Sequence, residues 1–124
     1  MINEAYPSKN PRPSIGVGII GLGARGLYCI ARNMAETFPE TGFKITALCD
    51  RNPHRIVEAE AAIRQSYAQH GVKIEPQHYE NGLDLIDDPD VDLVVITSIT
   101  DTHREFAVPA LHAGKKVYCD KPLA

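Results

Sequence analysis

The chain has 124 residues, of which 44% are hydrophobic and 23% are charged, and its formal net charge is -3 at pH 7. This length suits one packed domain, and the acidic balance argues against a nucleic-acid partner, which requires a basic surface. No apolar run reaches the roughly 18 residues of a membrane span, so no membrane association is expected. Residues 1–14 are polar and lack the apolar run of a secretory signal, so we predict a flexible arm before a domain at 15–124.

The three cysteines give no sign of a metal site or a disulfide. Cys29, Cys49 and Cys119 are far apart in the sequence, and none belongs to a Cys-x-x-Cys pair or lies at ligand spacing from a histidine. We therefore predict no metal and free thiols, which fits a reducing cytoplasm.

Apolar strand-like runs alternate with helical patterns from Ile15 onward, which predicts a parallel sheet with helices on both faces. The first half is predicted to contain a strand at 15–20, a helix with its apolar face at Leu27, Ile30, Ala31, Met34 and Phe38 that ends near Pro39 and Gly42, and a strand at 43–49.

Three helices and three strands are predicted in the second half. The helices are one capped by Asn52 with Ile56, Ala59, Ile63 and Tyr67 buried, a short one at 83–86, and one at 103–113 that Pro109 kinks or loosens. The strands lie at 72–75, where Pro76 limits the strand, at 91–97, and at 116–119. The result is a three-layer, doubly wound α/β fold with five strands, the Rossmann fold.

A glycine-rich turn follows the first predicted strand. Gly21, Gly23 and Gly26, with Ala24 and Arg25 between them, match Gly-x-Gly-x-x-Gly between a strand and a helix. The first glycine allows a tight turn, the second lets a pyrophosphate approach the backbone, and the third allows close helix packing. The helix N-terminus offers free N–H groups to the phosphates, so this segment is predicted to bind a dinucleotide.

An acidic residue ends the second predicted strand. A carboxylate at Asp50 accepts hydrogen bonds from ribose hydroxyls and repels a 2′-phosphate, which predicts NAD as the cofactor. Arg51 beside it offers a partner to a 2′-phosphate, so NADP stays as the alternative. In an open parallel sheet ligands bind beyond the carboxyl ends of the strands, where both of these residues lie.

The end of the chain resembles the glucose–fructose oxidoreductase, inositol dehydrogenase and rhizopine-catabolism (Gfo/Idh/MocA) family. That family has Thr-Pro-Asn-x-x-His after its fourth strand, an Ala-Leu-x-Ala-Gly-Lys helix end, and Glu-Lys-Pro after its fifth strand. This chain has Ser-Ile-Thr-Asp-Thr-His at 98–103, Ala-Leu-His-Ala-Gly-Lys at 110–115 and Asp-Lys-Pro at 120–122. Ile99 and Thr100 depart from the family's proline and asparagine, so the contacts made there are open.

The resemblance implies roles for six residues around the nicotinamide end of a cofactor. Lys121 would be catalytic, steadying or relaying the proton of a substrate hydroxyl. Asp120 would replace the family's glutamate, and the bond to Pro122 would be cis. Ser98 and Thr100 would contact ribose or pyrophosphate, and His103 would border the cofactor.

The family carries a second α/β domain that supplies the substrate pocket, so we expect this chain to stop before it. The implied protein is an NAD(P)-dependent oxidoreductase acting on a sugar or polyol, of which this chain binds nucleotide without turnover. The fifth strand is then an uncovered edge, and self-association into a homo-oligomer is a further hypothesis. A nucleotide-responsive regulatory module and an S-adenosylmethionine-dependent methyltransferase are the alternatives.

Overall fold

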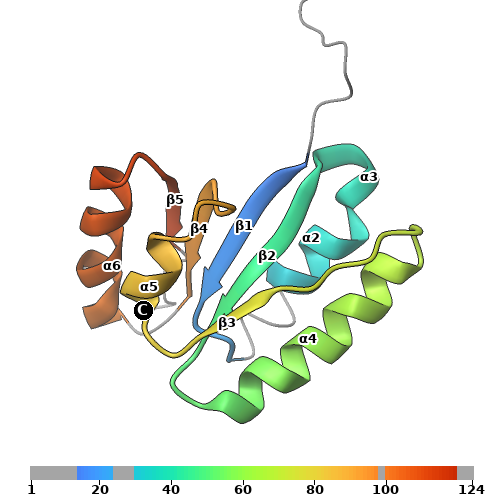
Figure 1. The fold of residues 1–124 in the computed structure, drawn as a ribbon, viewed down its shortest axis with the longest axis horizontal. Helices are drawn as coiled ribbons and strands as arrows, with labels where there is room; N and C mark the ends of the chain where they lie inside the picture. The colour runs from blue at the N-terminus through green and yellow to red at the C-terminus, as the bar shows by residue number, and fades with distance from the viewer. Residues whose placement is uncertain (1–13, 24–29, 98–99, 120–124) are drawn as a thin grey trace, which may run out of the picture.

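The computed structural model describes residues 14–23, 30–97 and 100–119, with the backbone alone for 100–104. Its sheet has five parallel strands in the order β3-β2-β1-β4-β5 (Figure 1). The strands are β1 (Ile15–Ile20), β2 (Phe43–Cys49), β3 (Gln77–Tyr79), β4 (Leu93–Ile96) and β5 (Lys116–Cys119). The chain moves from β1 outward to β3 and then crosses to β4 on the other side of β1. That crossing is the reversal of strand order expected of a doubly wound sheet.

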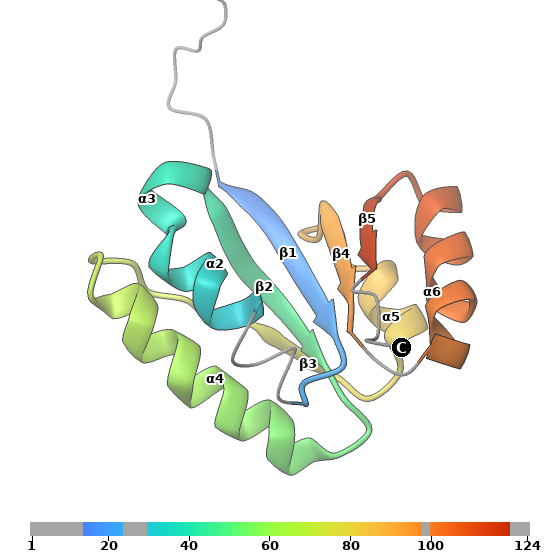
Figure 2. The same cartoon turned by 180° about the vertical axis from the view of Figure 1, so that it is seen from behind.

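Helices cover both faces, which confirms the predicted three layers. On one face lie α2 (Arg32–Glu36), α3 (Phe38–Thr41) and α4 (Pro53–Ala68), and on the other lie α5 (Gly82–Ile86) and α6 (Thr100–His112) (Figures 1 and 2). Two apolar cores result because strand side chains alternate between faces. In β1, for example, Ile19 packs under α4 while Ile20 packs under α5.

The third strand was predicted wrongly at 72–75, and a tyrosine explains why. The side chain of Tyr67 is fully buried, and its hydroxyl donates to the carbonyl of Phe43 at 2.6 Å and accepts from the N–H of Ile45 at 3.2 Å. These are backbone groups that a neighbouring strand would otherwise satisfy. The strand forms only after Pro76, where Gln77 comes opposite Ala47.

Three predicted boundaries also shift. The helix expected to run through Phe38 breaks at Thr37 into α2 and α3, with Pro39 in the first turn of α3, where a missing N–H costs nothing. Strand β4 is shorter than predicted, and α6 begins at Thr100 and continues through Pro109. Within the described residues, no helix has the length and apolarity to cross a bilayer.

The amino end of the sheet is tied by side chains that bond to backbone. Asp92 accepts from the N–H of Gly16 at 2.9 Å, and Thr46 donates to the carbonyl of Asp90 at 3.2 Å. A Cβ added at Gly16 would stand 1.8 Å from that same carbonyl oxygen, so only glycine fits. The ties hold β1 and β2 against the turn that precedes β4.

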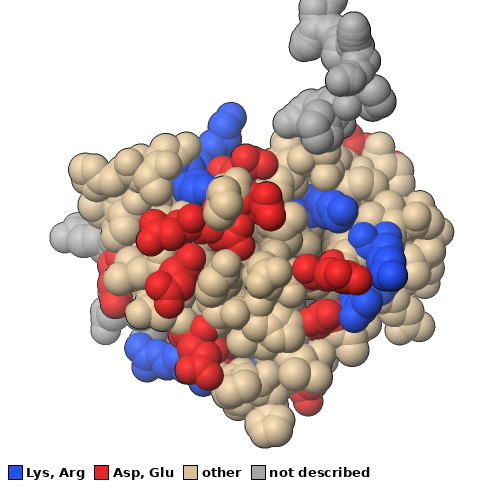
Figure 3. All heavy atoms as spheres, in the orientation of Figure 1, with Lys and Arg blue, Asp and Glu red and all other residues tan. Residues whose placement is uncertain are grey.

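Lys115 holds the same turn from the other side. Its ammonium donates to the carbonyls of Asp88 at 2.8 Å and Val91 at 2.5 Å. Figure 3 shows Asp and Glu side chains gathered on the face over α5 and this turn, which contains Asp87, Asp88 and Asp90. A cation among these carboxylates offsets part of their mutual repulsion.

Candidate nucleotide site at the carboxyl edge of the sheet

A cleft of about 1050 Å³ lies at the carboxyl ends of the strands. This volume is slightly above the roughly 300–1,000 Å³ that is typical of small-molecule sites, as an extended ligand requires. Its walls come from the turn after β1, the turn after β2, the start of α5, the end of β4 and the second turn of α6. The lining residues are Ile20, Gly21, Leu22, Gly23, Cys49, Asp50, Arg51, Asn52, Pro53, Arg55, Glu80, Asn81, Gly82, Thr97, Glu105 and Phe106.

The glycine turn forms one wall as predicted. Gly21 has φ +97°, a left-handed conformation that favours glycine, and its N–H donates to the carbonyl of Cys49 at 2.8 Å. At Gly23, no atom of the described residues lies within 4 Å of the place where a Cβ would stand. The backbone of Gly23 therefore has room for a phosphate to come close, which is the fit that a dinucleotide requires.

Asp50 is buried and organises the turns around it. One carboxylate oxygen accepts from the N–H of Leu22 at 2.8 Å, and the other accepts from the N–H of Asn52 at 2.8 Å. The guanidinium of Arg55 lies 3.8 Å from the carboxylate on its solvent side. Each carboxylate oxygen has a second lone pair, so Asp50 retains acceptor capacity for a ribose hydroxyl.

The opposite wall is the start of α5, packed tightly on α6. The side chain of Asn81 accepts from the N–H of Leu83 at 2.8 Å and so caps α5. A Cβ at Gly82 would come within 2.6 Å of the ring of Phe106 and 3.0 Å of Ile20. The absence of a side chain at Gly82 is what lets this wall close against the sheet.

Two titratable groups near the cleft stay neutral at physiological pH. Burial, with a smaller contribution from the carboxylates of Asp50 and Asp84, raises the pKa of Cys49 to about 12. A 2.7 Å hydrogen bond to Asp88, with smaller contributions from burial and neighbouring carboxylates, raises the pKa of Tyr79 to about 12. Cys49 is therefore a packed thiol rather than a nucleophile.

The structure brings four of the predicted binding residues together in the cleft: Gly21, Gly23, Asp50 and Arg51. Thr100 and His103 lie in the first turn of α6, where the backbone alone is described. The remaining predicted residues lie outside the described part of the chain, and they are Ala24, Arg25, Gly26, Ser98, Asp120, Lys121 and Pro122.

Several lining residues were not predicted as site residues, although some had a signal. Thr97 is the last residue of the predicted fourth strand. Because ligands bind beyond the carboxyl ends of the strands in an open parallel sheet, its position was a signal for a site residue. Arg55 lies one turn into the helix that follows Asp50. Gly82 and Phe106 had no signal, because their role depends on how α5 packs on α6.

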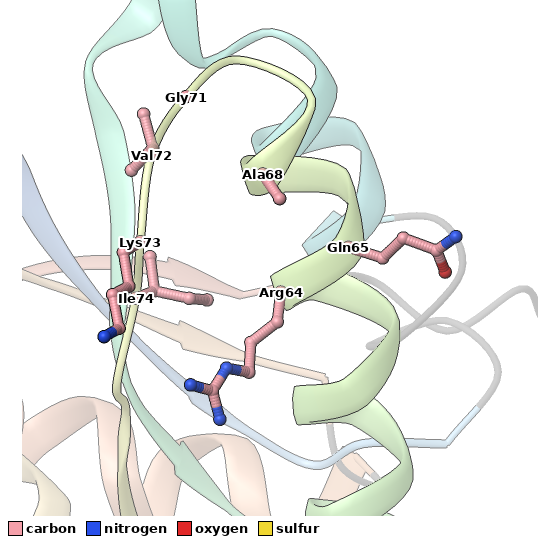
Figure 4. A pocket seen from close by; sticks show the side chains of 7 residues that line it. All are labelled: Arg64, Gln65, Ala68, Gly71, Val72, Lys73 and Ile74. Atoms are coloured by element: carbon pink, nitrogen blue, oxygen red, sulfur yellow. The ribbon is translucent and has the colours of Figure 1, made fainter.

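A second hollow, of about 480 Å³, lies between α4 and the segment that leads to β3 (Figure 4). Its two cations are already close to carboxylates. Arg64 lies 3.0 Å from Glu60, which also bonds to His78, and Lys73 lies 3.9 Å from Glu75. Gly71 is its one lining glycine and no helix N-terminus points into it, so among its lining residues this hollow lacks the glycine-rich loop and helix start that hold a dinucleotide.

The sheet topology, the positive-φ glycine turn and the buried carboxylate after β2 together define a dinucleotide-binding Rossmann domain. The chain belongs to the GFO_IDH_MocA oxidoreductase family, described by its NAD-binding Rossmann fold, whose model matches residues 15–124. The predicted family is thereby confirmed, and the methyltransferase alternative is set aside.

Relatives of this chain include inositol 2-dehydrogenases. The chain is 40% identical over 111 residues to that of Ralstonia nicotianae and 39% identical over 111 residues to that of Salmonella typhimurium. Each match covers 90% of this chain, and it covers 29% and 30% of the two relatives. The chain therefore spans about three-tenths of the length of these relatives.

Solved structures with the same fold include two nicotinamide complexes. The myo-inositol dehydrogenase of Lactobacillus casei in complex with NAD(H) and myo-inositol is 32% identical, with a TM-score of 0.67 over 90% of this chain and 29% of that protein. A levoglucosan dehydrogenase in complex with NADH and L-sorbose is 28% identical, with a TM-score of 0.68 over 91% of this chain and 29% of that protein.

Proposed function

We propose that this chain binds NAD in the carboxyl-edge cleft and serves as the cofactor domain of a dehydrogenase that oxidises a hydroxyl group of a polyol or sugar. One observation carries the proposal: the open backbone at Gly23 and the buried carboxylate of Asp50 line the same cleft. These are the two groups that a pyrophosphate and an adenosine ribose require, and they come from different strands.

The preference for NAD over NADP depends on Asp50. Its carboxylate is 8% exposed and lies at the cleft surface with an acceptor lone pair to spare. A 2′-phosphate beside it would place a second negative charge close to the Asp50 carboxylate in a partly desolvated cleft, and the repulsion between them would weaken binding. The exposed guanidiniums of Arg51 and Arg55 reduce that repulsion, so we expect NADP to bind weakly rather than not at all.

For catalysis, we assign Lys121 to the proton of the substrate hydroxyl. Bound NAD supplies the hydride acceptor. An ammonium at Lys121 would hold or relay the hydroxyl proton as charge develops on oxygen. The register supports this assignment, because β5 ends at Cys119, which lies opposite Ile96 at the end of β4, at the edge of the sheet where the cleft lies.

The substrate class is proposed from the relatives, which are inositol 2-dehydrogenases. A cyclic polyol bearing a secondary hydroxyl group is the substrate that we propose for the whole protein. We place the protein in the cytoplasm, supported by the free thiols of Cys49 and Cys119. Asp120 and Pro122 would frame the catalytic lysine, while Ser98, Thr100 and His103 would border the nicotinamide side.

Titration with NADH, followed by its fluorescence, tests the proposal on this chain. We expect saturable binding, with NADPH weaker. Asp50→Asn keeps the shape of the side chain but removes its charge, and we expect it to weaken NADH binding by roughly tenfold and to narrow the difference between the two nucleotides. Lys73→Met, in the second hollow, is the control and should leave both affinities unchanged. Fluorescence that does not respond to either nucleotide would sink the proposal.

We also propose self-association through the β5 side of the molecule. Strand β5 lies at one edge of the described sheet, and Tyr118 on it is 51% exposed. Leu111 on the neighbouring helix α6 is 62% exposed. An apolar edge invites pairing with another chain. Sedimentation velocity should show a concentration-dependent dimer that Tyr118→Lys abolishes, and a monomer at every concentration would contradict the idea.

A further inference from the structure

Thr97 links the end of β4 to the start of the glycine turn. Its N–H donates to the carbonyl of Ile20 at 2.9 Å, and its hydroxyl donates to the carbonyl of Gly21 at 2.5 Å. The residue is half-buried and lines the cleft. The hydroxyl of Thr97 therefore donates its hydrogen bond to the backbone of the turn and not to solvent.

The first two residues of the turn are consequently held from both sides of β1. The N–H of Gly21 bonds to the backbone of β2 through Cys49, and its carbonyl bonds to the hydroxyl of Thr97. The N–H of Leu22 bonds to the side chain of Asp50. Of these three bonds, those from Thr97 and Asp50 depend on side-chain identity, whereas the bond to Cys49 is backbone alone.

We propose that Thr97 is a positioning residue for the dinucleotide: its hydroxyl fixes the peptide that follows Gly21, so the turn holds one conformation before a ligand arrives. The inference rests on the function proposed above. A turn that fluctuates among conformations must be ordered on binding, and that ordering weakens the apparent affinity.

Threonine suits this role better than serine does. Its β-branched side chain has a restricted χ1, so little freedom is lost when the hydroxyl is aimed at the Gly21 carbonyl. Serine offers the same donor on a freer side chain. Valine has nearly the shape of threonine and lacks the donor, so it isolates the hydrogen bond from the packing.

The test compares three variants of the chain by NADH titration. We expect Thr97→Val to raise the Kd for NADH by about 3- to 10-fold, the range for one lost hydrogen bond, and Thr97→Ser to restore most of the affinity. Thr46→Val is the matched control, because Thr46 also donates from its hydroxyl to a backbone carbonyl but does not line the cleft. It should lower stability and leave the Kd unchanged.

Hydrogen exchange of the Leu22 amide gives a second readout that needs no ligand. We expect Thr97→Val to speed exchange at this amide more than at the amides of β1, and Thr46→Val to leave it unchanged. If the wild-type chain fails to bind NADH but the Leu22 amide responds in this way, the proposed function fails and the positioning of the turn stands. Unchanged exchange in Thr97→Val, or equal Kd values for the valine variant and the wild type, would overturn the inference.

Discussion

The two ends of the sheet differ in what surrounds them: side-chain bonds close the amino end, whereas the carboxyl end opens into a cleft. At the amino end, side chains bond to the backbone of β1 and of the turn before β4: Asp92 accepts from Gly16 in β1, and Lys115 donates to Asp88 and Val91 in the turn. At the carboxyl end, turns diverge around a cleft of about 1050 Å³. Even there the bonds of Asp50 and Thr97 go to the turns themselves.

The difference shows where this fold places its stability and where it places its chemistry. Loops that bind ligands come from the less stable parts of a protein, because they must leave backbone groups available. The tied amino end compensates by fixing the strands in register. Changes at the amino end should therefore affect unfolding, and changes at the carboxyl end should affect binding.

The largest effect is expected at Gly16. Gly16→Ala places a Cβ 1.8 Å from the backbone oxygen of Asp90, and a backbone atom moves away only at high cost. We expect the free energy of unfolding to fall by about 3 kcal/mol or more, measured by urea denaturation. Gly71→Ala is the control: the alanine would adopt a strained φ of +73°, but no described atom lies within 4 Å of its Cβ, so the loss should be only about 1 kcal/mol. Equal losses would show that the close contact at Gly16 relaxes easily.

A smaller loss is expected at Lys115. Lys115→Met removes the ammonium that satisfies the carbonyls of Asp88 and Val91 while keeping most of the aliphatic chain. We expect the free energy of unfolding to fall by about 2 kcal/mol in urea denaturation. Lys116→Met, at the exposed neighbour, should change it by less than about 0.5 kcal/mol. NADH affinity should be unchanged in both variants; a loss of affinity in Lys115→Met would contradict the separation of the two ends.

The smallest stability effect is expected at Tyr67. Tyr67→Phe keeps the ring, including its edge-on contact with Phe38, and leaves the Phe43 carbonyl and the Ile45 N–H without their partner. We expect a loss of about 1.5 kcal/mol in the free energy of unfolding at pH 8. A neutral result would mean that water replaces the hydroxyl at this buried position.

The same variant should change how stability depends on alkaline pH. Burial raises the pKa of Tyr67 to about 12, against a value of 10.0 in the unfolded chain, and the hydrogen bond from Ile45 only partly opposes this. Between pH 10 and 12 the unfolded chain releases a proton that the folded chain keeps, so the free energy of unfolding falls as pH rises. In Tyr67→Phe this fall should be shallower, whereas Tyr118→Phe, at an exposed tyrosine, should behave like the wild type.

Sequence patterns predicted the features that have a local signal, such as buried strands and the glycine turn. They missed the features that depend on contacts between segments far apart in the sequence. Strands β1 and β4 have near-continuous apolar or glycine runs, and β2 has apolar residues interrupted only by Lys44 and Thr46, so the existence of these strands was predictable. Gly23 and Asp50 were predictable because their spacing follows from the chemistry of a dinucleotide. The position of β3 was not, since it depends on a hydroxyl from α4 that reaches Phe43.

The site shows the same division. The hydroxyl of Thr97 meets the Gly21 carbonyl across 76 residues of sequence, and Gly82 matters only because Phe106 packs above it. Neither pairing leaves a local pattern. Arg55 is partly predictable: the sequence shows that it lies in the first turn of the helix after Asp50, but it does not show that the guanidinium comes within 3.8 Å of the carboxylate.

The tyrosine that stands in for a strand has one more consequence. Because the hydroxyl of Tyr67 already bonds to the Phe43 carbonyl and the Ile45 N–H, these two backbone groups on the outer flank of β2 are not available to pair with an added strand. Misassembly by strand addition, a common hazard of exposed sheets, is thereby discouraged on this flank. One buried phenol group therefore reduces the tendency of this flank to aggregate.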